Sequence, residues 1–337
     1  MKTDDLSGKL VTTVIILLAL CSLSFILLFM LRTEKINIPE DEITIVVTDS
    51  GLGGLSVVAD LERKLPPARI FKKVNLAFFN ALFSNKGGYN SLDSHDKKVR
   101  IFNESLYAME KRYKPDMILI ACNTLSVIYE DTDFAKNSKT PVTGIIDAGV
   151  ELIENQLNKT PDAKVIIFAT RTTVDVGRHR KELIQRGILP DRIITQKCHK
   201  LAGSIDRGFD SNETSQLVAG FVDEALVKLP SLDSPICVSF NCTHYGYIEP
   251  LWRKTFEQRN VKPIAFLNPN YVMTDLFFRP EKINRVEKTE LAIEIVSMVE
   301  ISQNKKDSFS RLMKSLCPQT VEALLNYQHK EDLFQWR

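Results

Sequence analysis

Short apolar runs alternate with segments of helical periodicity along most of the chain after residue 43. The apolar runs predict strands, which lie at residues 43–48, 75–79, 117–121, 141–146, 164–169, 192–196, 236–240 and 263–267. Helices are predicted between the first two strands up to residue 63, and at residues 93–112, 149–157, 176–186, 213–228, 289–301 and 309–328. Continuous apolar strands separated by helices are typical of parallel sheets covered on both faces, so the sequence predicts an α/β fold.

The overall composition is that of an ordinary folded protein. The hydrophobic share is 44% and the charged share is 26%. A balance of 44 basic against 42 acidic residues gives a net charge of +2, which offers no support for nucleic acid as the main partner. The length of 337 residues suggests two domains.

A segment near the N-terminus departs from this average. Residues 10–31 carry no charge and are bounded by Lys9 and Arg32. A helix of this length would measure about 33 Å, enough to cross the apolar core of a bilayer. A cleaved signal peptide is the alternative, but its apolar core is shorter, about 7–15 residues, and ends in small residues. The sequence therefore predicts a tail at residues 1–9, one transmembrane helix at residues 10–31 (Leu10 to Leu31) and a lipid bilayer as partner.

The cysteines indicate the redox state of the protein. They are Cys21, Cys122, Cys198, Cys237, Cys242 and Cys317. No two of them form a CxxC pair, no spacing suits zinc, and a chain of this length does not need a disulfide framework. Reduced thiols favour the cytoplasmic side of a membrane, although the basic residues that flank residues 10–31 specify the orientation poorly. We therefore expect a single-pass membrane protein whose α/β part faces the cytoplasm.

Ligands of parallel α/β folds bind at the carboxyl ends of the strands. Four predicted strands end in polar groups, namely Thr48-Asp49-Ser50-Gly51, Ala121-Cys122-Asn123-Thr124, Thr170-Arg171-Thr172-Thr173 and Asn241-Cys242-Thr243-His244. The first continues into Leu52-Gly53-Gly54, but a dinucleotide fingerprint fails because Ser56 replaces its third glycine and Phe71-Lys72-Lys73 replaces its acidic residue. Two interpretations stay open: a tight turn that packs closely, or a turn whose backbone N–H groups face an anion.

Two of these strand ends share a sequence pattern, in which a cysteine and small polar residues follow an apolar run. Cys122 and Cys242 lie 120 residues apart, about one domain length, so two similar halves could each supply one thiol to a shared cleft. A cysteine after a strand is otherwise a small buried hydrophobe. The strand ends offer too few ligands for a metal site. If a cysteine acts as a nucleophile, His244 could serve as its base. Two facing thiols suit another task, because one can remove a proton from a carbon while the other returns one from the opposite face.

The residues also resemble a known family. Three motifs resemble, in order and spacing, the signatures of the glutamate racemases of the aspartate/glutamate racemase superfamily, and they are Asp49-Ser50-Gly51-Leu52-Gly53-Gly54-Leu55-Ser56, Ala121-Cys122-Asn123-Thr124 and Cys242-Thr243-His244-Tyr245. Thr170 with Thr173 resembles the G-T-x-x-T element of that family, with Ala169 in place of the glycine. Ile205-Asp206-Arg207-Gly208 resembles its V-E-x-G segment. The resemblance extends from about residue 43 to residue 267.

The resemblance implies a fold and an activity. It implies two similar parallel-sheet α/β domains related by a pseudo-twofold axis, with the active site between them. The first domain would combine residues 43–141 and 245–337, and the second would comprise residues 142–244. The implied activity is racemisation of glutamate without pyridoxal phosphate, which in most members supplies D-glutamate for peptidoglycan. No lysine stands at a strand end in a setting for a Schiff base, so no cofactor is expected. The resemblance leaves a homodimer open.

The resemblance also assigns roles to single residues. Cys122 and Cys242 would be the two acid/base groups, with Asp49 beside the first and His244 beside the second. Five further residues would hold the α-carboxylate and α-ammonium of the substrate, and these are Ser50, Asn123, Thr124, Thr173 and Thr243. For three of these hydroxyls, those of Ser50, Thr124 and Thr243, helix N-capping is the alternative.

Some features depart from the family pattern. Asn80 and the loop at residues 85–90 replace an aspartate followed by Pro-Tyr-Gly, and residues 268–271 replace a small and acidic run. The N-terminal apolar segment and the C-terminal tail are not part of the pattern. These departures leave two alternatives open: an aspartate or other amino-acid racemase of the same superfamily, and an inactive membrane-tethered relative that serves as a binding or regulatory protein. The presence of both cysteines with Asp49 and His244 favours an enzyme.

Overall fold

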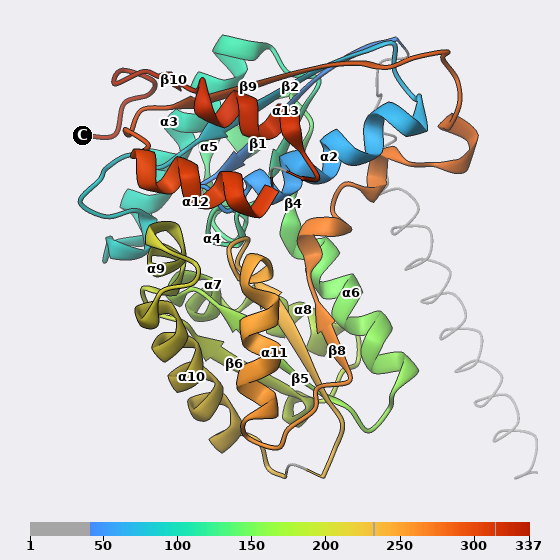
Figure 1. The fold of residues 1–337 in the computed structure, drawn as a ribbon, viewed down its shortest axis with the longest axis vertical. Coiled ribbons are helices and arrows are strands. Elements are labelled where there is room, and N and C mark those ends of the chain that lie inside the picture. The colour runs from blue at the N-terminus through green and yellow to red at the C-terminus, as the bar shows by residue number, and fades with distance from the viewer. Residues whose placement is uncertain (1–40, 232, 314) are drawn as a thin grey trace, which may run out of the picture. The chain divides into compact units, whose positions relative to one another are not determined.

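In the computed structural model, two parallel β-sheets organise the described part of the chain, which comprises residues 41–231, 233–313 and 315–337 (Figure 1). These residues pack as one unit. Every strand pair in both sheets is parallel, and helices connect most consecutive strands. The predicted fold class, two parallel-sheet α/β domains, is therefore confirmed.

The first sheet has six strands in the order β10-β9-β2-β1-β3-β4. They are β1 (Glu42–Asp49), β2 (Lys73–Asn80), β3 (Met117–Ile120), β4 (Val142–Gly144), β9 (Glu290–Ser297) and β10 (Gln328–His329). The helices connected to them are α2 (Leu55–Ala68), α3 (His95–Tyr113), α4 (Asn123–Ser126), α5 (Asp133–Asn137), α12 (Gln303–Met313) and α13 (Pro318–Leu325). Because β1 pairs with both β2 and β3, the ends of these three strands lie together.

The second sheet has four strands in the order β6-β5-β7-β8. They are β5 (Lys164–Ala169), β6 (Ile193–Lys197), β7 (Ile236–Asn241) and β8 (Ala265–Leu267). The helices are α6 (Ile145–Lys159), α7 (Arg171–Val176), α8 (Arg178–Gln185), α9 (Leu201–Arg207), α10 (Asn212–Val227) and α11 (Glu249–Glu257). Since β8 pairs with β7, the chain returns to the first sheet only after residue 267. We accordingly propose that the second domain extends to about residue 267, beyond the expected boundary at residue 244.

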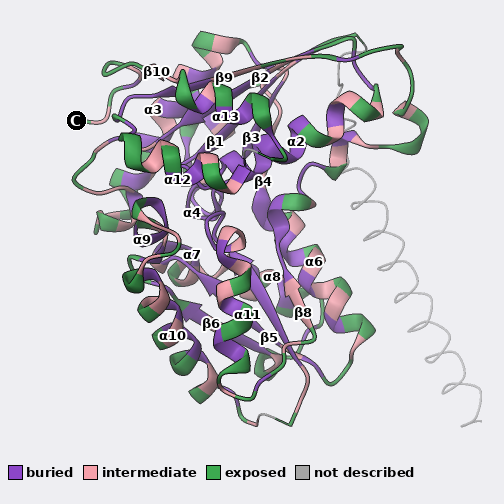
Figure 2. Cartoon of the chain, viewed as in Figure 1, coloured by how far each residue is buried: buried purple, intermediate pink, exposed green. Residues whose placement is uncertain are grey.

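A continuous apolar core joins the two sheets. One cluster of buried side chains includes Ile118 of β3 in the first sheet, Ile167 of β5 in the second, and Val150 and Ile153 of α6, which follows β4. Figure 2 shows the same arrangement, with buried residues along the strands and exposed residues on the outer faces of the helices. This shared core sets the strand ends of one sheet in a fixed relation to those of the other.

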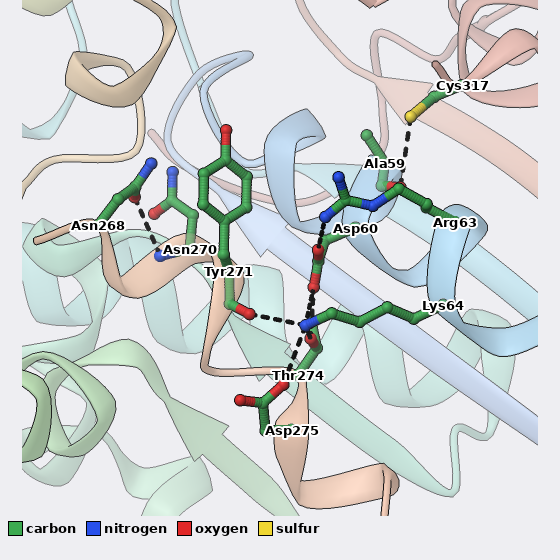
Figure 3. A network of polar contacts seen from close by, with 10 residues as sticks. All are labelled: Ala59, Asp60, Arg63, Lys64, Asn268, Asn270, Tyr271, Thr274, Asp275 and Cys317. Atoms are coloured by element: carbon green, nitrogen blue, oxygen red, sulfur yellow. Dashed lines mark hydrogen bonds and ion pairs between the residues drawn. The ribbon is translucent and has the colours of Figure 1, made fainter. Parts of the chain in front are cut away.

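The segment that returns the chain to the first sheet is fastened to α2 by polar contacts (Figure 3). The Lys64 ammonium donates to the carbonyl oxygen of Tyr271 at 2.7 Å and to Asp275 Oδ1 at 2.9 Å. Asp60, which is buried, accepts a hydrogen bond of 2.5 Å from Thr274 and pairs with Lys64 at 2.7 Å. The contacts with Thr274, Asp275 and the carbonyl oxygen of Tyr271, the last of residues 268–271, thus anchor the crossover between the two sheets.

All eight strands predicted up to residue 267 are present, but the C-terminal prediction was partly wrong. Residues 289–301, predicted as a helix, contain strand β9, which pairs with β2 over its whole length. Leu291, Ile293 and Ile295 alternate with other residues, so the pattern fits a strand as well as a helix. Pairing with the neighbouring strand β2 determines that the segment is a strand. The single helix predicted at residues 309–328 is divided between α12 and α13, because Pro318 cannot continue a helix from its N-terminal side.

The prediction of a single-pass membrane protein facing the cytoplasm is corrected. No helix within residues 41–231, 233–313 and 315–337 is both long and apolar enough to cross a membrane. The longest of them, α3, has 19 residues but carries charges such as Lys98, Glu104 and Arg112 along its length. Residues 10–31, on which the prediction rested, lie outside the described residues.

Candidate active site

The carboxyl ends of strands from both sheets meet at a cavity of about 510 Å³. Eight of the nine predicted site residues line it, and they are Asp49, Ser50, Cys122, Asn123, Thr124, Cys242, Thr243 and His244. The exception is Thr173, which is buried behind Thr170 at 3.0 Å between their hydroxyl oxygens. Thr170 itself lines the cavity. The structure therefore brings both cysteines to one cavity, as the spacing of the motifs predicts.

The glycine run between β1 and α2 permits a close approach between the two halves of the site. A Cβ atom at Gly53 would lie 2.7 Å from His244 Cε1, and one at Gly54 would lie 2.7 Å from Asp49 Cβ. Only glycine avoids these clashes. The first N–H groups of α2, those of residues 55–58, are bonded to carbonyl oxygens of residues 52–54, as the interpretation of a tight turn expects.

The surroundings of Cys122 are acidic and largely buried. The Ser50 hydroxyl lies 3.1 Å from Cys122 Sγ. Burial raises the pKa of Asp49 to about 6, although His244 and the hydrogen bond from Thr243 offset part of the effect. Burial, with the nearby Asp49 carboxylate, raises the pKa of the Cys122 thiol well above its usual range. Cys122 is therefore a thiol that holds its proton at neutral pH.

The surroundings of Cys242 are cationic. His244 Nδ1 lies 3.7 Å from Cys242 Sγ, and His244 Nε2 lies 2.9 Å from Asp206 Oδ1. Burial acts to lower the pKa of His244, but the Asp206 carboxylate outweighs it and raises that pKa well above 6.5. Burial acts to raise the pKa of Asp206, but His244 and then Lys305 outweigh it and lower that pKa. The pair is therefore carboxylate and imidazolium, with one N–H directed at the Cys242 sulfur.

Hydrogen-bonding groups for a substrate line the same cavity as the two thiols. The amide of Asn123 is buried at the cavity wall, and neither its oxygen nor its nitrogen has a partner among the described residues. The hydroxyl of Thr124 lies 2.7 Å from that of Thr170 and accepts from Asn90 Nδ2 at 3.3 Å. Buried polar groups are rarely left unpaired, so the Asn123 amide is a candidate for binding a polar ligand. The structure shows no side-chain cap for α2 or α4, the helices that follow Ser50 and Cys122.

Sequence reasoning assigned no role to several residues that the structure places at the cavity. Asp206 had a signal, the resemblance to the V-E-x-G segment, whereas Lys305 of α12 lies outside every motif. Asn270 was noted only as a departure, but its Nδ2 donates to the carbonyl oxygen of Thr243 at 3.0 Å and so supports that segment. Besides the His244 imidazolium, the lysine and arginine side chains that line the cavity are Arg171, Lys200, Arg207 and Lys305. The cavity thus suits a small anion. Among the described residues no cluster of three or more metal-ligating side chains occurs.

Comparison with known proteins places this geometry in context. A sequence model of the family described as Asp/Glu/Hydantoin racemase matches residues 53–233. A glutamate racemase of Persephonella marina is 27% identical over 222 residues, which cover 65% of this chain and 76% of that protein. One of Campylobacter jejuni is 34% identical over 141 residues, which cover 42% of this chain and 52% of that protein.

Solved structures share the fold. The glutamate racemase of Francisella tularensis in complex with D-glutamate aligns with a TM-score of 0.60 at 20% identity, and covers 87% of this chain and 96% of that one. The Campylobacter jejuni enzyme aligns with a TM-score of 0.59 at 22% identity, and covers 80% of this chain and 98% of that one. At these identities the structural likeness is evidence for the fold.

Proposed function

Because the chain belongs to the Asp/Glu/Hydantoin racemase family, we propose that it interconverts L-glutamate and D-glutamate by two-base proton transfer without a cofactor. Its sequence relatives named glutamate racemase support this substrate. The observation that carries the mechanism is the cavity itself, where Cys122 and Cys242 have different acid/base partners. As the family resemblance implies, the D-glutamate formed would serve peptidoglycan synthesis.

The reaction requires one thiol to accept a proton and the other to donate one. In one direction the Cys242 sulfur, as thiolate, forms an S–H bond as the Cα–H bond of glutamate breaks. The Cys122 S–H bond then breaks as a new Cα–H bond forms on the opposite face. The roles reverse in the other direction. The pKa of Cys122, raised by burial, keeps that thiol protonated and ready to donate, while His244 Nδ1 faces the Cys242 sulfur at 3.7 Å.

The remaining residues hold the substrate and lower the barrier. A Cα–H is a very weak acid, and proton transfer to a placed group contributes only about 10²–10⁴-fold. The planar carbanion carries its charge on the α-carboxylate, so donors at that position stabilise the transition state. We propose that Asn123, Thr124 and Thr243 hold the carboxylate, with Ser50 and Thr170 nearby. Thr173 would act through Thr170, since it is buried behind it.

A direct test is chiral analysis of L-glutamate after incubation with the purified full-length protein. The proposal predicts D-glutamate rising towards an equimolar mixture without added cofactor. L-aspartate in a parallel reaction is the control for side-chain preference. Inversion of aspartate but not of glutamate would contradict the proposed substrate, and inversion of neither would contradict the proposed activity.

A further inference from the structure

Helix α12 contributes a cation to the cavity from a part of the chain that the motifs do not include. It follows β9 of the first sheet, yet it contacts α9, which follows a strand of the second (Figure 1). Arg311 of α12 lies 3.5 Å from Asp210 and stacks on Phe209 at 5.1 Å. Phe309 packs edge-on against the His244 ring at 6.5 Å between ring centres. These contacts fix α12 beside the acid/base residues of the Cys242 side.

Lys305 is the residue of α12 that forms an ion pair with Asp206. Its ammonium lies 3.7 Å from Asp206 Oδ2, while Asp206 Oδ1 is occupied by His244 at 2.9 Å. The two carboxylate oxygens therefore have separate cationic partners. The side chains of Asp206 and Lys305 are 11% and 25% exposed, so water screens the interaction less than on an open surface.

We propose that Lys305 is a positioning residue of the racemase site, which holds the Asp206 carboxylate in line with His244 and thereby keeps the imidazolium directed at Cys242. The inference rests on the proposed function of the cavity. It adds a C-terminal element to a site otherwise built from strand ends. The reason is geometric: a carboxylate bonded through one oxygen can rotate about its Cβ–Cγ bond, and a second partner on the other oxygen prevents this.

The charges around Cys242 indicate what the loss of Lys305 would do. Asp206, His244 and Lys305 together carry a charge of about +1, and without Lys305 they carry none. Other titratable groups that face this cluster are Asp49, Cys198, Tyr245 and Tyr247. None of them is a cation at neutral pH, so none replaces Lys305. Lys200 and Arg207 line the cavity, and Arg207 pairs with Glu213 at 2.7 Å.

The test compares three variants of the full-length protein. Lys305→Met removes the charge and keeps much of the side-chain length, and Lys305→Arg keeps the charge. Lys306→Met is the matched control, because Lys306 lies on the same helix over the Tyr327 ring at 5.8 Å, away from the cavity. Two kinds of measurement are made across pH. The first gives kcat and KM for glutamate, and the second gives the rate at which iodoacetamide alkylates Cys242, followed by mass spectrometry of its peptide.

For Lys305→Met we expect kcat to fall about tenfold at neutral pH with KM changed less than about twofold, and the rising limb of the pH profile to move to higher pH. Alkylation of Cys242 should slow by about 3- to 10-fold at the same pH and show the same displacement. Lys305→Arg should restore most of both properties, and Lys306→Met should match the wild type. Unchanged kcat and unchanged Cys242 alkylation in Lys305→Met would overturn the inference.

The two readouts separate this inference from the proposed function. If the wild type does not invert glutamate, the function fails, and Cys242 alkylation still decides the role of Lys305. If the wild type inverts glutamate and Lys305→Met neither slows the alkylation of Cys242 nor displaces its pH profile, the proposed function stands and the inference fails alone.

Discussion

The hydroxyl of Thr243 donates a hydrogen bond of 2.8 Å to Asp49 Oδ2, across 194 residues of sequence. Thr243 lies between Cys242 and His244, while Asp49 belongs to the strand end beside Cys122. Both partners are buried. The hydrogen bond therefore connects the surroundings of the two thiols, and it fixes the carboxylate whose protonation influences Cys122.

Asp49→Asn should stabilise the protein at alkaline pH. Burial raises the pKa of Asp49 from 3.8 to about 6, so the folded state binds this proton more tightly than the unfolded state does. The charged carboxylate therefore lowers the free energy of unfolding. This destabilisation is absent below about pH 4 and complete above the folded pKa of Asp49. Asparagine carries no charge and still accepts from Thr243. We expect a gain of up to about 3 kcal/mol near pH 8 and little gain near pH 4 in urea unfolding.

Asp60→Asn is the matched control for that measurement. Asp60 is also buried, but Arg63 and Lys64 pair with it at 2.8 and 2.7 Å. Removing its charge takes an acidic partner from both cations and leaves Lys64 paired only with the exposed Asp275, so this variant should be destabilised. An Asp49→Asn protein less stable than the wild type near pH 8 would show that the buried Asp49 carboxylate does not destabilise the folded state.

Asp206→Asn should remove the positive charge from His244. Burial acts to lower the pKa of His244, and the Asp206 carboxylate, followed by Cys242, outweighs it. Without the larger of these two opposing contributions, the pKa should fall and the ring should lose its charge. Nitrogen NMR of the imidazole should show a cation in the wild type and a neutral ring in the variant. The pair stabilises the folded state fully between about pH 4 and pH 6.5. This contribution is lost as pH rises through the folded pKa of His244, and also as pH falls through the lowered pKa of Asp206.

The effect of Asp206→Asn on catalysis should be equal in both directions when expressed as kcat/KM. L- and D-glutamate have the same free energy, so no variant can alter the ratio of the two kcat/KM values. We expect a fall of about 10²-fold in each. A neutral imidazole in the wild type at pH 7 would contradict the assignment of the Asp206–His244 pair.

Gly53→Ala should impair both stability and activity. Its Cβ would lie 2.5 Å from His244 Nδ1, so the ring or the turn must shift. We expect a destabilisation of about 1–3 kcal/mol and a loss of activity of about 10²-fold, because the shift displaces an acid/base group. Gly220→Ala is the control: Gly220 lies in α10 with no atom within 4 Å of the added Cβ, and alanine there should stabilise the helix by about 0.5–1 kcal/mol. Equal behaviour of the two variants in thermal unfolding and turnover would refute the close contact at Gly53.

The sequence predicts the strand-end part of the site well, for a physical reason. Cys122 and Cys242 lie within two residues of the ends of buried strands, and the parallel sheet brings each to the cavity without help from distant residues. Strand β9 could not be predicted, since its sequence pattern fits a helix as well. Only its pairing with β2 determines that the segment is a strand. Lys305 could not be predicted because a lysine on an amphipathic helix is ordinarily a solvated residue, and its role depends on the contact between α12 and α9.

The placement of Thr173 shows a finer limit of the sequence. Thr170 and Thr173 are three residues apart at the start of α7, and either could reach a ligand. Thr170 caps the helix by accepting from the Thr173 N–H at 3.5 Å, and this geometry turns the Thr173 hydroxyl behind it. The motif predicts that both threonines lie near the site, but the N-cap geometry of α7 determines that Thr170 faces the cavity.

The central claim is that Cys122 and Cys242 each serve one face of Cα. The measurement that tests it most directly follows L-glutamate in heavy water with the wild type, Cys122→Ala, Cys242→Ala and the control Cys237→Ala, which removes a buried thiol that does not line the cavity. The account predicts that the wild type and Cys237→Ala form D-glutamate carrying deuterium at Cα before the remaining L-glutamate is labelled, and that the other two variants fold but form no D-glutamate. A correctly folded Cys122→Ala or Cys242→Ala protein that inverts glutamate near the wild-type rate would contradict it.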